Sequence, residues 1–163
     1  MERQLIVMRH AKSSWADEGR TDHQRTLNDR GRRASPRVAI ELRELGWQPQ
    51  HILSSDSQRT RESVALLLKV WESGIQADFL ESLYLAGPRE LSAAMVEVSE
   101  EVEALLVVGH NPGWAGVVHQ LSGVDMTMKT ATAAMLKANC ESWSDAFKTE
   151  WSLENVIHPR ELE

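Results

Sequence analysis

The sequence predicts an α/β fold in which a mainly parallel β-sheet lies between two layers of helices. Short, wholly apolar runs such as LIVM (residues 5–8) and ALLVV (104–108) are typical of strands that are buried on both faces. Between these runs, apolar residues recur at helical spacing over longer segments, some of which end at glycine. Strand and helix therefore alternate along the chain, as they do in three-layer α/β/α sandwiches.

Four elements are expected in the first half of the chain. The strand at 5–8 leads into a polar, irregular stretch from Lys12 to Leu27, and the segment NDRGRRASPRVAIELRELG then predicts a helix that ends at Gly46. A second strand, HILSS (51–55), precedes a second helix. The apolar faces of these helices are made by Ala34, Val38, Leu42 and Leu45 in the first, and by Val64, Leu67, Leu68 and Trp71 in the second.

The second half continues the same alternation. The segment IQADFLESLY (75–84) is expected to be extended or irregular, and Pro88 is expected to open a third helix. A strand at 104–110 precedes a fourth helix, and shorter strands are expected around 131–138 and 150–157. The apolar positions are Leu91, Ala94, Met95, Val98 and Val102 in the third helix, and Trp114, Val117, Val118 and Leu121 in the fourth.

Composition narrows the class of protein. A chain of 163 residues, 42% hydrophobic and 26% charged, suits one domain spanning 1–163 that needs no disulfide or metal for stability. The net charge of −6, without a basic stripe, argues against nucleic acid as a partner. The single cysteine, Cys140, suits a reducing compartment. No apolar run is long enough for a signal peptide or a membrane span, so we expect a cytoplasmic protein with no membrane partner. The oligomeric state is not indicated.

Polar residues capable of chemistry follow three of the expected strands. Arg9 and His10 follow the first, Arg59 lies just inside the helix after the second, and His110 follows the third. Ligands of open α/β sheets bind at the carboxyl ends of the strands. We therefore expect these four side chains to meet at one edge of the sheet.

The chemistry available to such a cluster is narrow. Guanidinium groups are planar forks that match the oxygens of a phosphoryl group. A histidine among cations tends to stay neutral, and a neutral imidazole can attack phosphorus. No carboxylate cluster has metal-ligand spacing, so the site is expected to use no metal and no cofactor.

Four segments together resemble the histidine phosphatase superfamily, which has the phosphoglycerate-mutase-like fold. They are LIVMRHAKSSW (5–15), TLNDRGRRA (26–34), SSDSQRTRES (54–63) and VVGHNPGW (107–114). Within the superfamily, the chain resembles the small SixA-like phosphohistidine phosphatases. The resemblance implies that His10 is the nucleophile that becomes phosphorylated and that Arg9, Arg59 and His110 form the phosphate pocket.

The chain departs from the pattern of many relatives, which carry an Asn after the Arg-His pair and a distinct acidic proton donor. Lys12, Ser13 and Ser14 are candidates to replace the missing oxygen contact, and Glu81 is the candidate acid. Expelling imidazole from phosphorus requires less help from an acid than expelling an alcohol, because the pKa of imidazole is about 6.5. The lack of an obvious acid therefore favours a P–N bond in the substrate.

The sequence thus predicts a metal-free phosphatase that forms a phosphohistidine intermediate on His10. Its expected partner is a phosphorylated substrate, with a phosphohistidine-bearing protein as the first candidate. Hydrolysis of small phosphate esters, a phosphomutase activity and a non-catalytic module that binds phosphorylated ligands are the alternatives.

Overall fold

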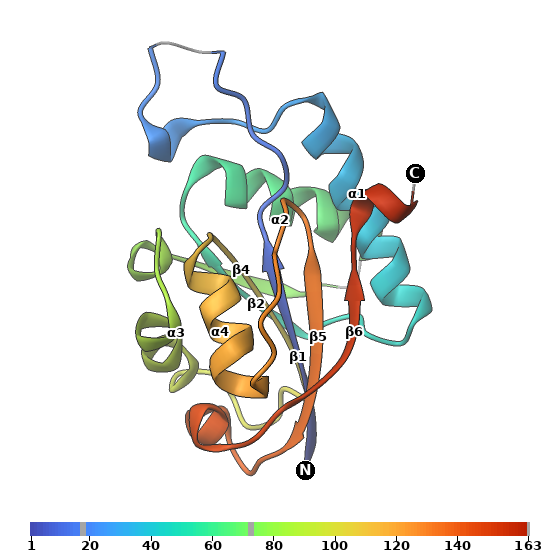
Figure 1. Ribbon diagram of the computed structural model, residues 1–163, viewed down its shortest axis with the longest axis vertical. Helices are drawn as coiled ribbons and strands as arrows, with labels where there is room; N and C mark the ends of the chain where they lie inside the picture. The colour runs from blue at the N-terminus through green and yellow to red at the C-terminus, as the bar shows by residue number, and fades with distance from the viewer. Residues whose placement is uncertain (17–18, 72–73, 163) are drawn as a thin grey trace.

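One β-sheet organises the computed structural model, which describes residues 1–16, 19–71 and 74–162 (Figure 1). Over these residues the sheet has six strands in the order β3-β2-β4-β1-β5-β6. The four parallel strands are β1 (Glu2–Arg9), β2 (His51–Ser55), β3 (Gln76–Leu80) and β4 (Ala104–Gly109). Two antiparallel strands, β5 (Ala133–Asn139) and β6 (Ser152–Ile157), extend the sheet beyond β1. The predicted mainly parallel sheet is confirmed.

The central strands are apolar on both faces because helices cover both faces. Along β1, Leu5 and Val7 face one cluster of buried side chains, whereas Ile6 and Met8 face the other. The residues of β4 alternate between the same two clusters. Side chains of a strand point alternately to opposite faces, so a continuous apolar run serves both cores at once.

The helices form the two outer layers (Figure 1). The first pair, α1 (Asp29–Glu44) and α2 (Gln58–Trp71), pack together on one face of the sheet. The second pair, α3 (Pro88–Met95) and α4 (Gly113–Ser122), cover the other face. No helix in the described part of the chain combines the length and apolarity required to cross a bilayer. The remaining helices are short 3₁₀ segments, namely η1 (Asp22–Gln24), η2 (Glu81–Leu83), η3 (Trp143–Lys148) and η4 (Pro159–Leu162).

The start of α1 is fixed by contacts that also hold the loop after β1. The Asn28 side chain caps the helix by accepting a hydrogen bond from the Gly31 amide at 2.9 Å. The Asn28 amide in turn donates to the carbonyl of Lys12 at 3.0 Å. Gly31 packs directly under Lys12, and a Cβ at this position would collide with the Lys12 carbonyl oxygen. The first turn of α1 therefore supports the loop that carries Lys12.

One expectation about local structure needs correction. The third helix ends at Met95, so Val98 and Val102 lie outside it. After Met95 the amide of Val98 bonds the Met95 carbonyl, three residues back, in a tight turn. Val98 is nevertheless buried, because apolar spacing reports which side chains face the core and does not fix the backbone hydrogen bonds. The segment 75–84, expected to be extended or irregular, contains the extended strand β3 followed by η2. The stretch 12–27, whose residues 17–18 lie outside the described part, contains the short segment η1.

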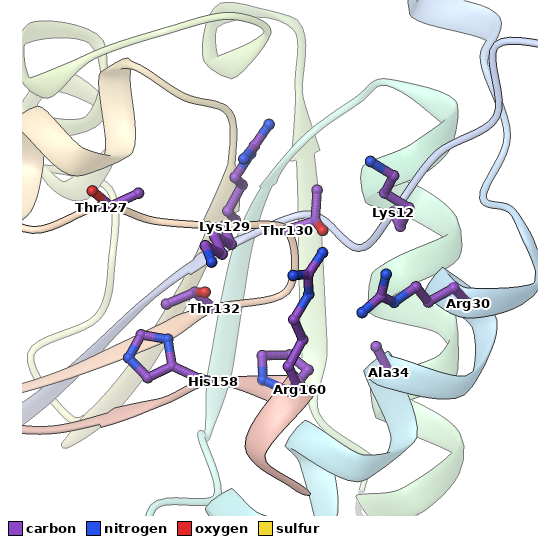
Figure 2. A pocket seen from close by; sticks show the side chains of 11 residues that line it. Lys12, Arg30, Ala34, Thr127, Lys129, Thr130, Thr132, His158 and Arg160 are labelled. Atoms are coloured by element: carbon purple, nitrogen blue, oxygen red, sulfur yellow. The ribbon is translucent and has the colours of Figure 1, made fainter. Parts of the chain in front are cut away.

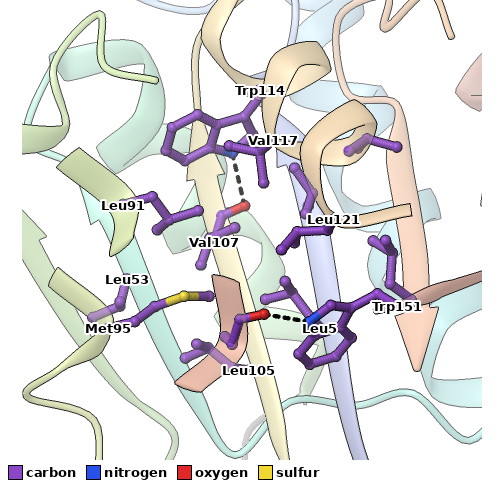
Figure 3. Close-up of a cluster of buried hydrophobic side chains, with 14 of the residues drawn as sticks. Leu5, Leu53, Leu91, Met95, Leu105, Val107, Trp114, Val117, Leu121 and Trp151 are labelled. Atoms are coloured by element: carbon purple, nitrogen blue, oxygen red, sulfur yellow. Dashed lines mark hydrogen bonds between the residues drawn. The ribbon is translucent and has the colours of Figure 1, made fainter. Parts of the chain in front are cut away.

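Tryptophans fill much of the core on the side of α3 and α4 (Figure 3). The Trp114 indole donates to the Val107 carbonyl at 3.1 Å, and the Trp151 indole donates to the Ala146 carbonyl at 2.8 Å. Both N–H groups are thus satisfied inside the apolar layer. Trp15 is the exception, because its side chain is 76% exposed.

Candidate active site

Three neighbouring parallel strands end at the same edge of the sheet and bring the candidate residues together. His10 follows β1 and His110 follows β4. Arg59 lies in the first turn of α2, four residues beyond the end of β2. The His10 amide donates to the Gly109 carbonyl at 3.0 Å, which continues the pairing of β1 with β4. The two imidazole rings consequently lie 5.3 Å apart, centroid to centroid.

His10 is held with one ring nitrogen available for reaction. Its Nδ1 lies 2.7 Å from the carbonyl oxygen of Ala11. Because a carbonyl oxygen can only accept, Nδ1 carries the proton and Nε2 carries the lone pair. The Arg59 Nε–H donates to that Nε2 at 3.3 Å. Burial of the ring, which is 6% exposed, and the nearby Arg59 charge together lower the pKa of His10 to about 3. The hydrogen bond to Ala11 opposes this shift.

Arg59 is the hub of the cluster and is 3% exposed. Besides His10, its guanidinium donates to the backbone carbonyl of Asp22 at 2.7 Å and to the Asp22 carboxylate at 3.1 Å. It also donates to Nδ1 of His110 at 3.3 Å. Asp22 therefore fixes the position of Arg59 between the two imidazoles and balances part of its charge.

His110 is neutral and bonded through both ring nitrogens. Since Nδ1 accepts from Arg59, its Nε2 carries the proton and donates to Oγ of Ser55 at 2.8 Å. Burial lowers the pKa of His110 to about 4, helped by the Arg59 charge and opposed by Asp22. The arrival of a phosphoryl dianion would raise this pKa, because a nearby negative charge favours the imidazolium.

Arg9 lies between the cluster of His10, Arg59 and His110 and the loop before β5. One of its terminal nitrogens donates to the carbonyl of Met128 at 3.0 Å, whereas Nε is buried without a hydrogen-bond partner. Desolvation and the nearby Arg59 charge lower the pKa of Arg9. A guanidinium with a vacant donor group beside a second guanidinium is suited to an anion.

These side chains open into a cavity of about 170 Å³, which we call the catalytic cavity. Its lining consists of Arg9, His10, Lys12, Ser13, Trp15, Arg25, Arg59, Leu85, His110, Asn111 and Thr130. Six of the candidates from the sequence meet here, because Lys12 and Ser13 join the four residues of the Arg-His cluster. The volume suits a phosphoryl group with a few surrounding atoms, and no Asp or Glu is among the lining residues.

Two further candidates are not brought to this cavity. Ser14 is absent from the lining, and its carbonyl oxygen accepts a hydrogen bond from Arg25 at 3.2 Å. Glu81 is exposed at the start of η2 and is also absent from the lining. The carboxylate that approaches the cluster instead is Asp22 of η1. Desolvation alone would raise its pKa, but hydrogen bonds from Tyr84 and the charge of Arg59 lower the pKa of Asp22 to about 2.

Comparison with known proteins places this arrangement in a family. A sequence model of the histidine phosphatase superfamily (branch 1) matches residues 5–84, which include Arg9, His10 and Arg59. A solved structure from Nakamurella multipartitia, provisionally named phosphohistidine phosphatase SixA, is 27% identical and superimposes with a TM-score of 0.84 over 98% of this chain and 97% of that one. The chain belongs to the histidine phosphatase superfamily.

Other known proteins match nearly the whole chain. The protein histidine phosphatase SixA in complex with tungstate is 19% identical, has a TM-score of 0.79 and matches 98% of this chain and 99% of that chain. An uncharacterized chloroplastic protein of Arabidopsis thaliana is 35% identical over 98% of this chain and 79% of its own length. The predicted phosphoglycerate-mutase-like α/β fold and the SixA-like resemblance are confirmed.

In this histidine phosphatase superfamily member, sequence reasoning missed several residues around the cluster. Asp22 and Tyr84 come from segments without periodicity, and the hydrogen bonds that Asp22 accepts from Tyr84 and Arg25 form only in the folded chain. Arg25 also bonds the Ser13 hydroxyl and stacks on the Trp15 ring. Arg25 thereby holds the loop after β1, to which it also donates at the Ser14 carbonyl.

Within residues 1–16, 19–71 and 74–162, no group of three or more His, Cys, Asp or Glu side chains is arranged to hold a metal ion. The side chains that converge on the catalytic cavity are instead cations and imidazoles, which suit an anionic group.

Proposed function

We propose that this protein is a phosphatase that works through a phosphohistidine intermediate on His10, and that its substrate carries phosphohistidine. The observation that carries the proposal is the state of His10, whose uncharged Nε2 faces a small cavity lined by Arg9, Arg59 and His110. A lone pair held beside two guanidinium groups and a second imidazole is arranged for attack on a phosphoryl group.

In the first step, Nε2 of His10 attacks phosphorus and the bond from phosphorus to the leaving group breaks. The hydrogen bond from Nδ1 to the Ala11 carbonyl supports the positive charge that develops on the imidazole. Arg59 transfers its Nε–H bond from Nε2 to a phosphoryl oxygen, and Arg9 supplies further donors. His110 donates from Nδ1 once the phosphoryl dianion has raised its pKa and the ring is protonated. These contacts strengthen as negative charge shifts to the equatorial oxygens.

In the second step, water attacks the phosphorus of phospho-His10. The P–Nε2 bond breaks, its electron pair returns to Nε2, and the proton lost by water leaves to solvent as phosphate departs. The catalytic cavity suits this step because its rim is open at Lys12 and Trp15, both of which are exposed. A mutase would have to exclude water at this point.

The leaving group decides the choice of substrate. The carboxylate nearest the cluster, Asp22, has a pKa of about 2 and is a poor acid at neutral pH. Glu81 stays a candidate acid, although it does not line the cavity. A leaving imidazole, with a pKa of about 6.5, takes its proton from solvent more readily than an alkoxide does. The expected partner is therefore a cytoplasmic protein phosphorylated on histidine.

The test follows ³²P from a histidine-phosphorylated protein. Wild-type enzyme should acquire a transient label that acid removes and base leaves intact, and should release phosphate. His10→Ala should abolish both label and turnover, whereas His119→Ala, which removes an exposed histidine of α4, should leave both unchanged. Turnover by folded His10→Ala would overturn the mechanism. A lower kcat/KM for the phosphohistidine protein than for p-nitrophenyl phosphate would overturn the substrate assignment.

A further inference from the structure

A second, larger cavity lies beside the catalytic cavity. It has a volume of about 450 Å³ and is lined by Arg9, Lys12, Arg30, Ala34, Thr127, Lys129, Thr130, Thr132, His158, Pro159 and Arg160 (Figure 2). Its walls come from the loop after β1, the first turn of α1, the loop before β5 and the C-terminal segment at η4. We call this cavity the basic chamber. A volume of this size accommodates a small ligand.

The charge of the basic chamber is opposite to that of the whole chain. Five of its eleven lining residues are lysine or arginine, a sixth is His158, and none is Asp or Glu. The chain as a whole carries 24 acidic against 18 basic residues. Like charges gathered in a concave wall focus the potential and attract an anion.

Most of these cations have no partner in the fold. The side chains of Lys12, Arg30, Lys129 and Arg160 form no hydrogen bond or ion pair with any other described residue. Figure 2 shows Arg30 reaching into the chamber from α1 and Arg160 reaching into it from η4. Because the fold does not use these donors, their convergence is available to a ligand.

The basic chamber and the catalytic cavity share a wall. Arg9, Lys12 and Thr130 line both spaces. Two buried polar atoms in this region, Nε of Arg9 and Oγ1 of Thr132, have no hydrogen-bond partner. A molecule whose phosphoryl group reaches His10 can therefore extend past Arg9 and Lys12 into the basic chamber.

We infer that the basic chamber binds a second anionic group of the substrate, a phosphate or a carboxylate, while the phosphoryl group to be transferred lies against His10. This inference rests on the proposed phosphatase function and adds a charge requirement to it. Arg30 and Arg160 are the specificity-determining residues, because their planar donors match anionic oxygens and they lie outside the catalytic cavity. The C-terminal segment thereby acquires a role that its sequence did not indicate.

The second anionic group has two chemical sources, and two series of compounds separate them. The first series pairs alkanediol bisphosphates of three to eight carbons with the matching monophosphates. The second pairs phosphohistidine peptides flanked by glutamate with peptides flanked by glutamine. The series that contains the true second group should show a preference for the member with the extra charge. For that member, the kcat/KM of wild-type enzyme should be higher by about tenfold or more, which is the effect of one charged hydrogen bond.

The decisive variant is Arg30→Ala combined with Arg160→Ala. It should reduce that preference to about twofold or less and leave kcat/KM for the singly charged member within about twofold of wild type. Arg33→Ala, which removes an exposed arginine of α1 outside the chamber, should keep the full preference. As a readout without catalysis, the bisphosphate of best length should bind His10→Asn protein about tenfold more weakly when Arg30 and Arg160 are also alanine.

The outcomes separate this inference from the proposed function. Absence of phosphate release from every compound, together with absence of label on His10, overturns the proposed phosphatase. Turnover with no preference for the extra charge in either series overturns the basic chamber as a substrate site. A preference that survives in the double variant also overturns it.

Discussion

Replacing His10 by asparagine should make the protein less sensitive to acid. In the folded wild type, burial and the cations around His10 hold its pKa at about 3, whereas the unfolded chain has a histidine pKa of about 6.5. Between these two values the unfolded state binds more protons than the folded state, so the free energy of unfolding falls as the pH falls below about 6.5. Asparagine cannot take up a proton, so the variant loses this part of the pH dependence.

The two pKa values set the size of the effect. At pH 7.5 the protonation of His10 costs the folded state almost nothing. At pH 5 the difference in proton uptake amounts to about 2 kcal/mol. His110, with a pKa of about 4, gives a cost of similar size at pH 5 that remains in the variant. Asp22 has a lowered pKa, so the stability that it contributes is lost only below about pH 4. It therefore does not affect the comparison between pH 7.5 and pH 5.

The assay is urea unfolding at pH 7.5 and pH 5 in buffers without phosphate, because a bound oxyanion would raise the pKa of both histidines. From pH 7.5 to pH 5, wild type should lose about 2 kcal/mol more than His10→Asn. His119→Asn, which removes an exposed histidine, is the matched control and should follow wild type. Equal losses in wild type and His10→Asn would refute the buried, neutral nucleophile.

Three other predictions concern the site. Arg59→Ala should lower kcat about 10²–10³-fold in steady-state assays, because it removes a contact to the transferred phosphoryl group. Arg61→Ala, on the exposed side of α2, should leave kcat unchanged, and equal effects of the two substitutions would argue against this role of Arg59. Asp22→Asn should lower kcat/KM about tenfold, because Arg59 loses a charged contact, while circular dichroism shows an unchanged fold; full activity would mean that Asp22 does not position Arg59. Activity should persist in excess EDTA, and loss that only added metal restores would contradict a reaction without metal.

The sequence identified the strands that position the arginine and histidine side chains of the site. An apolar run that serves two cores must lie in the middle of the sheet, so the residues directly after such runs emerge at its edge. This reasoning located Arg9, His10 and His110, and the position of Arg59 after the second strand completed the cluster. The spacing of apolar residues along the chain indicates which side chains are buried. For that reason these positions could be predicted from the sequence alone.

The surroundings of the cluster depended on the tertiary structure. Asp22 and Arg160 lie in segments without periodicity, and each reaches the site region only because distant elements pack against them. The third helix shows the same limit, since Val98 faces the core as its spacing indicates although the helix has already ended at Met95. Apolar spacing reports exposure to the core, whereas the meeting of polar side chains from separate loops depends on long-range contacts that no local pattern records.

Sequence alone therefore determined the α/β class, the family and the four residues at the strand ends. Only the folded chain decided that Asp22 braces Arg59, that Glu81 stays outside the catalytic cavity, and that a basic chamber adjoins it. The physical reason is that strand ends inherit their place from the hydrophobic pattern of the strand. A loop takes its place from the whole set of contacts that close around it.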